Sequence, residues 1–144
     1  MTTLALPKFK NRALLKQALT HRSLPNHNER FEFLGDGILQ GIVTSMLVQH
    51  FPHAREGELT NKRSALVRNQ TLAKLAKMLN LGKQLKMAKG AERQGCRQNS
   101  RILSNALEAV LGAYFIDSGC DFEKVERYVQ SLFKALPNSR KRKK

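Results

Sequence analysis

Apolar residues recur at helical spacing along most of this 144-residue chain, and that periodicity predicts an all-α fold. We expect a first helix around residues 14–19, which Pro25 separates from the next one. We expect further helices from about 28 to 50, from 58 to 67, from a cap at Asn69 to Gly82, from a cap at Ser100 to Gly119, and from a cap at Asp121 to Pro137. The helix over 28–50 is apolar on more than one face, so we predict that it is a central helix surrounded by others.

One domain accounts for nearly the whole chain, because we find no internal repeat, no convincing strand and no second domain. We assign residues 1–137 to a single helical bundle, which is long enough to bury a hydrophobic core. Within it, the basic stretch 82–99 is expected to be a loop-like connection with weak helical pieces. Residues 138–144 form a basic tail that ends in five consecutive Lys and Arg residues and that we expect to be disordered.

The charge balance indicates a polyanionic partner. The chain has 26 Lys and Arg against 11 Asp and Glu, a net charge of +15, and its pI is about 10.4. A balance this basic is typical of proteins that bind nucleic acid and, less often, of proteins that bind an anionic membrane. A highly charged surface that serves only solubility is the remaining alternative.

The chain gives no sign of export or of a membrane anchor. Its start lacks the continuous apolar core of a secretory signal, and we see no stretch near the roughly 20 apolar residues that a membrane span needs. Cys96 and Cys120 are the only cysteines and have no metal-binding spacing, which predicts reduced thiols and a cytoplasmic location. We therefore expect no membrane partner.

Carboxylates interrupt the two most apolar segments of this basic chain. The predicted helix over 28–50 begins with three of them: Glu29, Glu32 and Asp36. Residues 37–49 then hold no charge, and Glu108 is the only charged residue within 102–116. Because carboxylates are rarely buried without a partner, we expect something cationic to bind them, and a metal ion is the leading candidate.

The spacing of these residues fits one shared site. Glu32 and Asp36 are four residues apart and share a helix face, and Asn105 and Glu108, three apart, share another. If the two helices pack together, four oxygen-bearing side chains converge. Oxygen ligands suit Mg²⁺, with Mn²⁺ as a substitute. Such a site can activate water against a phosphodiester.

Two other interpretations of the carboxylates stay open at this point. Acidic residues near a helix start, such as Glu29 and Glu32, often only complement the helix dipole. Buried carboxylates could instead pair with an arginine from elsewhere in the fold, such as Arg63 or Arg101.

The residues around these carboxylates closely resemble the signature of ribonuclease III endonuclease domains. The signature is Asn28-Glu-Arg-Phe-Glu-Phe-Leu-Gly-Asp36. Further segments match the family in the same order: LTHRS at 19–23, EGELT at 56–60 with ALV at 65–67, ILSNALEAVLG at 102–112 and YFIDSG at 114–119. The resemblance covers roughly residues 10–135, and so many motifs in order make a chance match implausible.

The resemblance implies an all-helical endonuclease domain that acts as a homodimer on double-stranded RNA. Glu32, Asp36 and Glu108 match the metal-binding catalytic carboxylates of the family, and Asn105 takes the fourth position of that catalytic set. The family usually has Asp at this fourth position. Because an amide keeps an oxygen donor but loses the charge, we expect weaker metal affinity, although some family members are similar in carrying Asn.

Supporting roles follow from the same resemblance. Glu29 matches a signature acid that supports the site, Phe33 matches the aromatic residue that inserts into the partner subunit, and Glu56 matches an acid near the RNA path. We expect RNA phosphates to be bound by basic residues of 83–101 and of the tail, including Lys89, Arg93, Arg97 and Arg101. Recognition should follow the shape of the duplex rather than its base edges.

These observations favour a metal-dependent endoribonuclease that leaves 5′-phosphates and short 3′ overhangs, in rRNA or other RNA processing. The alternative is a catalytically weak module of the same fold that binds structured RNA, and Asn105 is its only support. A carboxylate-bridged redox bundle would need Glu-x-x-His pairs, which are absent. Most bacterial members append a double-stranded-RNA-binding domain, which is not visible in this sequence. Either the chain is naturally short or the sequence is part of a longer protein.

Overall fold

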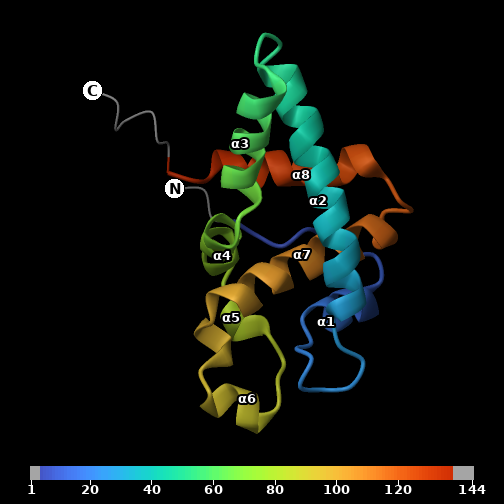
Figure 1. The fold of residues 1–144 in the computed structure, drawn as a ribbon. Coiled ribbons are helices and arrows are strands. Elements are labelled where there is room, and N and C mark those ends of the chain that lie inside the picture. The colour runs from blue at the N-terminus through green and yellow to red at the C-terminus, as the bar shows by residue number, and fades with distance from the viewer. Residues whose placement is uncertain (1–3, 138–144) are drawn as a thin grey trace.

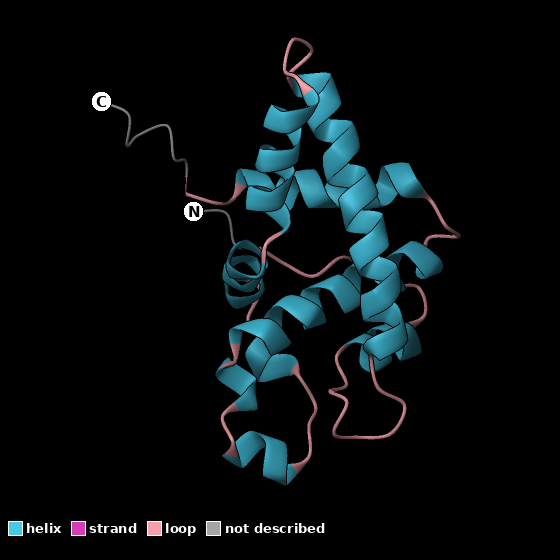
Figure 2. Ribbon diagram, viewed as in Figure 1, coloured by secondary structure: helices cyan, strands magenta, loops and turns pink. Residues whose placement is uncertain are grey.

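The computed structural model describes residues 4–137, which form a bundle of helices (Figures 1 and 2). The elements are α1 (Arg12–Ala18), α2 (Glu29–His50), α3 (Glu56–Val67), α4 (Asn69–Met78), α5 (Leu81–Gln84), α6 (Lys89–Arg93), the 3-10 turn η1 (Cys96–Gln98), α7 (Ser100–Asp117) and α8 (Phe122–Lys134). Within residues 4–137 the only strand-like pairing is an isolated bridge between Thr20 and Lys86. The predicted all-α fold is confirmed, while the tail 138–144 lies outside the described residues.

The helix caps differ from the predicted ones by small shifts. The cap at Asp121 is confirmed, because its carboxylate accepts a hydrogen bond of 3.1 Å from the Lys124 N–H. The predicted caps at Asn69 and Ser100 are each wrong by one residue, since both already belong to the first turn of their helices. Asn99 caps α7 instead, and its side-chain oxygen accepts hydrogen bonds from two backbone N–H groups of the first turn.

The predicted end of the fourth helix at Gly82 is also wrong. The chain turns at Asn80, which adopts a left-handed conformation with φ of 56°, a region that Asn tolerates better than most residues. Gly82 lies inside α5, where a Cβ atom would come within 2.7 Å of the Arg97 carbonyl oxygen. This glycine is therefore explained by close packing rather than by helix termination. The stretch 82–99 contains the weak helical pieces that were predicted.

The central helix is α7 rather than α2. Helix α7 runs through the middle of the bundle (Figure 1), where it contacts α1, α2, α4, α5 and α8. Most of its side chains are buried. Helix α2 packs against α7, α3 and α8 but leaves Phe33 85% exposed and Val48 55% exposed. The prediction that α2 is surrounded was wrong because part of its second apolar face lies on the surface of this chain.

Helix α2 is long and apolar enough, by length and composition alone, to cross a membrane. On that criterion the prediction that no stretch would qualify was wrong. Core helices of soluble proteins can have the same length and composition. In this fold one stripe of α2, which includes Leu39, Ile42, Val43 and Leu47, is buried in the hydrophobic core.

Two glycines allow the backbones of α2 and α7 to touch where the helices cross. A Cβ atom on Gly35 would lie 1.7 Å from the carbonyl oxygen of Glu108, and one on Gly112 would lie 2.2 Å from that of Phe31. Any larger residue would force the two helices apart. This contact sets the separation of the helices that carry the predicted site residues.

We expect Gly35→Ala to lower the free energy of unfolding by roughly 1–3 kcal/mol or more, because the added methyl group overpacks a backbone contact. Gly37→Ala is the matched control: a Cβ atom there meets nothing within 4 Å, and alanine favours the helix by roughly 1 kcal/mol. Urea unfolding of both variants measures the difference. Equal effects of the two substitutions would contradict the proposed contact.

Candidate active site

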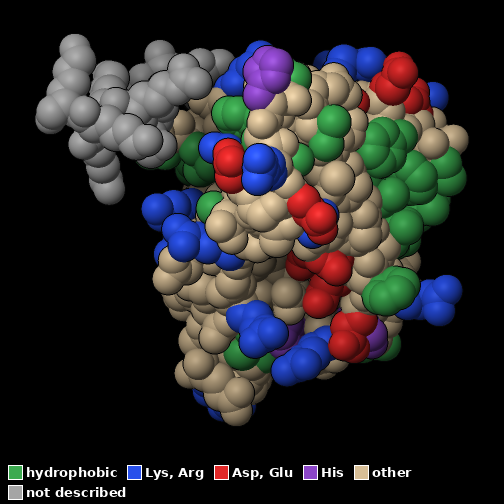
Figure 3. Space-filling view, turned by 45° about the horizontal axis from the view of Figure 1, so that its top comes forward, with side chains coloured by type: hydrophobic (Ala, Val, Ile, Leu, Met, Phe, Trp, Pro, Cys, Tyr) green, Lys and Arg blue, Asp and Glu red, His purple; other side chains and the backbone are tan. Residues whose placement is uncertain are grey.

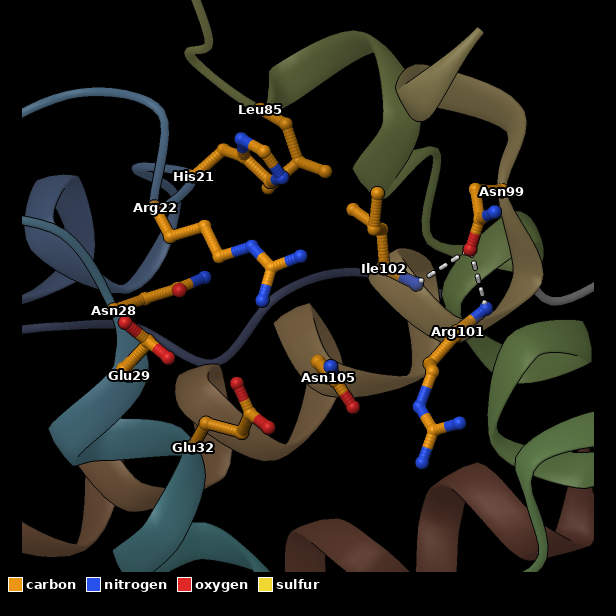
Figure 4. A pocket seen from close by; sticks show the side chains of 10 residues that line it. All are labelled: His21, Arg22, Asn28, Glu29, Glu32, Leu85, Asn99, Arg101, Ile102 and Asn105. Atoms are coloured by element: carbon orange, nitrogen blue, oxygen red, sulfur yellow. Dashed lines mark hydrogen bonds between the residues drawn. The ribbon is translucent and has the colours of Figure 1, made fainter. Parts of the chain in front are cut away.

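Glu29, Glu32, Arg101 and Asn105 line a hollow between α2 and α7. Asp36 and Glu108 are not among its lining residues, but they lie close to each other and to Glu32, because the charges of Asp36 and Glu32 both raise the pKa of Glu108. Figure 3 shows carboxylate side chains in a recess of one face of the molecule, with Lys and Arg side chains near it. The hollow has a volume of about 350 Å³, and Figure 4 shows its lining residues: His21, Arg22, Asn28, Glu29, Glu32, Leu85, Asn99, Arg101, Ile102 and Asn105. Three separate parts of the sequence therefore contribute to it.

Hydrogen bonds from Asn28 fix the start of α2 against the end of α1. The buried Asn28 side chain donates to the carbonyl oxygen of Ala18 at 3.0 Å, and its backbone N–H donates to the carbonyl oxygen of Thr20 at 3.0 Å. The Asn28 side chain makes no capping bond to α2. Asn28 thus sets the position of the helix that carries Glu29 and Glu32.

The start of α7 is fixed by Arg97 as well as by its cap. The Arg97 guanidinium donates to the carbonyl oxygens of Gly82 at 2.6 Å and Leu85 at 2.8 Å, and it forms an ion pair of 3.2 Å with Glu92. These bonds join α5 and α6 to the turn that precedes α7. Arg97 was predicted to bind RNA, but in this structure its guanidinium serves the fold.

Glu108 is the most buried of the predicted ligands, with an exposed fraction of 9%. Burial raises its pKa to about 8, and a hydrogen bond with the Asp36 side chain and the negative charges of Asp36 and Glu32 act in the same direction. Burial also raises the pKa of Glu32, followed by the charge of Glu29. Arg22 and Arg101 oppose that rise from opposite sides of the hollow.

No cation of the described chain neutralises this cluster by direct pairing. Between residues 4 and 137 the ion pairs are His27 with Glu29 at 3.7 Å and Arg97 with Glu92, so Glu32, Asp36 and Glu108 have none. The Arg63 guanidinium donates to the Thr44 hydroxyl instead. The structure therefore does not support the alternative that Arg63 or Arg101 pairs with the buried carboxylates.

The donor set fits a hard divalent cation. Three carboxylates and the amide of Asn105 are all oxygen donors, without the thiolates or imidazoles that softer metals prefer. In the described part of the chain no three His, Cys, Asp or Glu side chains stand close enough to form a complete metal-binding group. The site would therefore need side-chain adjustment, the Asn105 oxygen and other donors such as water or phosphate to complete the coordination.

The other predicted residues lie in different places. Glu29 lines the hollow but is more than half exposed, and Glu56 lines a separate hollow between α2 and α3. Lys89 and Arg93 are exposed on α6, and Phe33 is exposed on α2. Within the single chain, Glu56, Lys89 and Arg93 do not line the hollow that Asn105 and Glu32 share. Asp36, which is exposed on α2, and the buried Glu108 do not line it either.

Sequence reasoning missed His21, Arg22 and Asn99 as lining residues. The first two belong to the LTHRS segment at 19–23, which was noticed as a motif but given no role. No periodicity could have placed this loop, because its position depends on long-range hydrogen bonds. One of them runs from the His21 N–H to the carbonyl oxygen of Lys86, between α5 and α6, at 2.8 Å.

Comparison with known proteins identifies close relatives. The family model described as Ribonuclease-III-like matches residues 11–136. A ribonuclease 3 of Syntrophotalea carbinolica is 44% identical over 133 residues, which are 87% of this chain and 56% of the relative. A ribonuclease 3 of Nostoc sp. is 43% identical over 136 residues, 90% of this chain and 60% of the relative. The chain thus spans little more than half the length of these curated relatives.

Solved structures show the same architecture. The nuclease domain of ribonuclease III from Campylobacter jejuni superimposes with a TM-score of 0.85 and 40% identity, covering 91% of this chain and 90% of that one. A second structure of that domain is described as showing structural flexibility in the region involved in dimer formation. A Dicer from Pichia stipitis matches with a TM-score of 0.73 and 29% identity, over 92% of this chain and 59% of that one.

The raised pKa of Glu108 predicts a pH-dependent stability in the absence of metal. Its pKa moves from 4.5 to about 8 on folding, so between these values the folded state binds more protons than the unfolded state. The stability that Glu108 contributes is therefore complete below the lower value and is lost as the pH rises through the upper one. Glu108→Gln keeps a neutral side chain that can donate to Asp36 at every pH.

We therefore expect the free energy of unfolding of Glu108→Gln, relative to wild type, to increase as the pH rises from about 5 to about 8.5. Denaturant unfolding in the presence of a chelator measures it. Glu123→Gln, an exposed change on α8, is the control and should show no such trend. A difference for Glu108→Gln that does not change with pH would disprove the raised pKa.

Proposed function

Because this chain belongs to the ribonuclease III family, we propose that its domain is an endoribonuclease for double-stranded RNA. Its active site would be the carboxylate cluster of α2 and α7 together with the hollow beside it. The observation that carries the proposal is the cluster of Glu32, Asp36 and Glu108, which has no cationic partner in residues 4–137. The net charge of +15 supports a polyanionic substrate.

Glu32, Asp36, Asn105 and Glu108 would hold Mg²⁺, or Mn²⁺ in its place. Bound there, the cation supplies Lewis acidity to the phosphodiester and lowers the pKa of an attacking water. The chain's own part is to release the proton that Glu108 holds against Asp36, and to fix α2 and α7 so that their oxygen atoms face one another. Asn105 offers an oxygen without a charge and so would weaken cation affinity.

We propose that two copies of this domain act together. The exposed Phe33 lines a depression together with Phe31, Leu34 and Ile116, and polar residues of 27–30 complete its lining. Figure 3 shows apolar side chains grouped at one edge of the face that carries the carboxylates. An exposed ring next to a depression of this kind is suited to an isologous contact, in which each copy fills the depression of the other. Two active sites would then face one duplex and cut both strands, leaving 5′-phosphates and short 3′ overhangs.

Duplex RNA would be bound mainly through its phosphates. Lys89, Arg93 and Arg101 are exposed and carry no ion pair within the described residues, which supports their use on a polyanion. The basic tail, outside the described residues, belongs to the same proposal. We place the protein in the cytoplasm, without a membrane partner and with a role in rRNA or other RNA processing. The free thiols of Cys96 and Cys120 agree with that compartment.

A catalytically weak domain that only binds structured RNA is the second candidate, and the neutral Asn105 favours it. The two candidates differ in one observable, which is metal-dependent cleavage. Binding without cleavage at saturating Mg²⁺ would favour the second.

The decisive experiment compares wild type with Glu108→Ala on a long RNA duplex. Wild type should cut the RNA only with Mg²⁺ or Mn²⁺ and should leave a DNA duplex intact. Glu108→Ala should lose at least about 100-fold in rate, since loss of an outer partner of a metal ligand already costs 10–100-fold. Glu123→Ala is the control for loss of one carboxylate. Wild-type cleavage by Glu108→Ala would refute the assignment of the site.

Phe33→Ala should dissociate the dimer, because each subunit loses a large apolar contact, at a cost on the order of several kcal/mol. The fold should be unaffected, since the side chain is 85% exposed in the single chain. Sedimentation over a range of concentrations measures the change. Met78→Ala, another exposed apolar side chain, should leave association unchanged. A wild-type monomer under cleaving conditions would rule out the proposed arrangement.

A further inference from the structure

Two arginines line the carboxylate hollow from different elements. Arg22 belongs to the segment between α1 and α2, and Arg101 belongs to the first turn of α7. Figure 4 shows Arg22 extending over Asn28 and Glu29 toward the middle of the hollow, and Arg101 beyond Asn105 on the other side. The two positive charges therefore lie on either side of Glu32, whose pKa both of them lower.

Neither guanidinium is used by the fold. Among residues 4–137, no hydrogen bond from the side chain of Arg22 or Arg101 and no ion pair of either is present. Arg97 differs, because its guanidinium donates to two backbone carbonyl oxygens and pairs with a carboxylate. The donors of Arg22 and Arg101 are thus available to an anion that enters the hollow.

The backbone around Arg22 is held on both sides. The N–H of His21 donates to the carbonyl oxygen of Lys86 at 2.8 Å, and the Ser23 hydroxyl accepts from the N–H of Ala88 at 2.9 Å. The Ser23 hydroxyl also lies 2.8 Å from Nδ1 of His21. This network fixes the position of Arg22 while leaving its side chain exposed, so the LTHRS segment presents a cation to the site.

Arg101 stands at a position where its positive charge does not stabilise α7. It follows the cap Asn99 by two residues, near the positive end of the α7 dipole, where a basic side chain is electrostatically unfavourable. The side chain also buries no surface in the core, since Arg101 is exposed. A contribution to the stability of α7 therefore does not explain this residue, whereas an anion in the hollow would.

We propose that Arg22 and Arg101 bind the two RNA phosphates that flank the scissile phosphate, one on each side of the carboxylate cluster. This inference rests on the proposed function of the site. Carboxylates repel an approaching phosphodiester, and two cations beside them offset that repulsion and set the register of the strand. The guanidinium suits this task because its planar donors bind phosphate in a bidentate manner.

The test uses Arg22→Gln and Arg101→Gln, with Arg127→Gln on α8 as a control for the same loss of charge outside the hollow. The value of kcat/KM on a short RNA duplex should fall about 10- to 100-fold for each of the first two variants. A loss of this size is expected when one hydrogen bond to a charged group is removed. The slope of log kcat/KM against log salt should become shallower by roughly 0.7–0.9 for each, since one phosphate contact is lost. Arg127→Gln should change neither.

Neutral methylphosphonate groups identify the phosphates. Replacing one flanking phosphate should slow cleavage by wild type but should not slow Arg22→Gln any further. Replacing the other flanking phosphate should slow wild type but should not slow Arg101→Gln any further. Arg22→Lys and Arg101→Lys keep the charge and should retain the salt slope with a partial loss of rate, which excludes misfolding as the cause. Variants that behave like Arg127→Gln, or losses that add at every phosphate, would overturn the inference while leaving the proposed function intact. A wild type that cuts no RNA would overturn both.

Discussion

The close contact between α2 and α7 is the constraint on which the site depends. Gly35 and Gly112 let the two backbones touch, and this brings Glu108, buried on α7, beside Asp36 on α2. A carboxylate in that position is costly when ionised, and its pKa near 8 means that a proton is held there in the absence of another cation. The packing of the two helices thus places two carboxylates side by side, and both can be ionised only if a positive charge binds next to them.

The side chains around these carboxylates are suited to a negatively charged substrate. The ion pairs of residues 4–137 lie outside the triad of Glu32, Asp36 and Glu108, and Arg22 and Arg101 lie beside it without partners. A cation held by the carboxylates would attract a phosphodiester, and the two arginines would orient the strand on either side. The excess of 15 positive charges over the whole chain would draw the polyanion toward the domain from a distance.

The helical periodicity was sufficient to predict the long helices, although not all of their ends. The i, i+3 and i, i+4 spacing was sufficient to nominate Glu32, Asp36, Asn105 and Glu108, because both spacings are local properties of a helix. Tertiary contacts decided the rest. The placement of Arg22 beside α7 and the structural use of Arg97 depend on residues distant in sequence. Gly82 is a further example. From the local sequence it was predicted to end a helix, whereas in the structure a glycine is needed there because the backbone of Arg97 packs against it.

The central claim is that the cluster around Glu108 requires a divalent cation, and Mg²⁺-dependent unfolding at about pH 8 tests it most directly. Wild type should gain stability as Mg²⁺ rises, by about 2.7 kcal/mol when the free ion reaches 100 times its dissociation constant. Glu108→Gln, which needs no counter-charge at this position, should gain far less. Equal stabilisation of the two proteins, or none of wild type, would contradict the account.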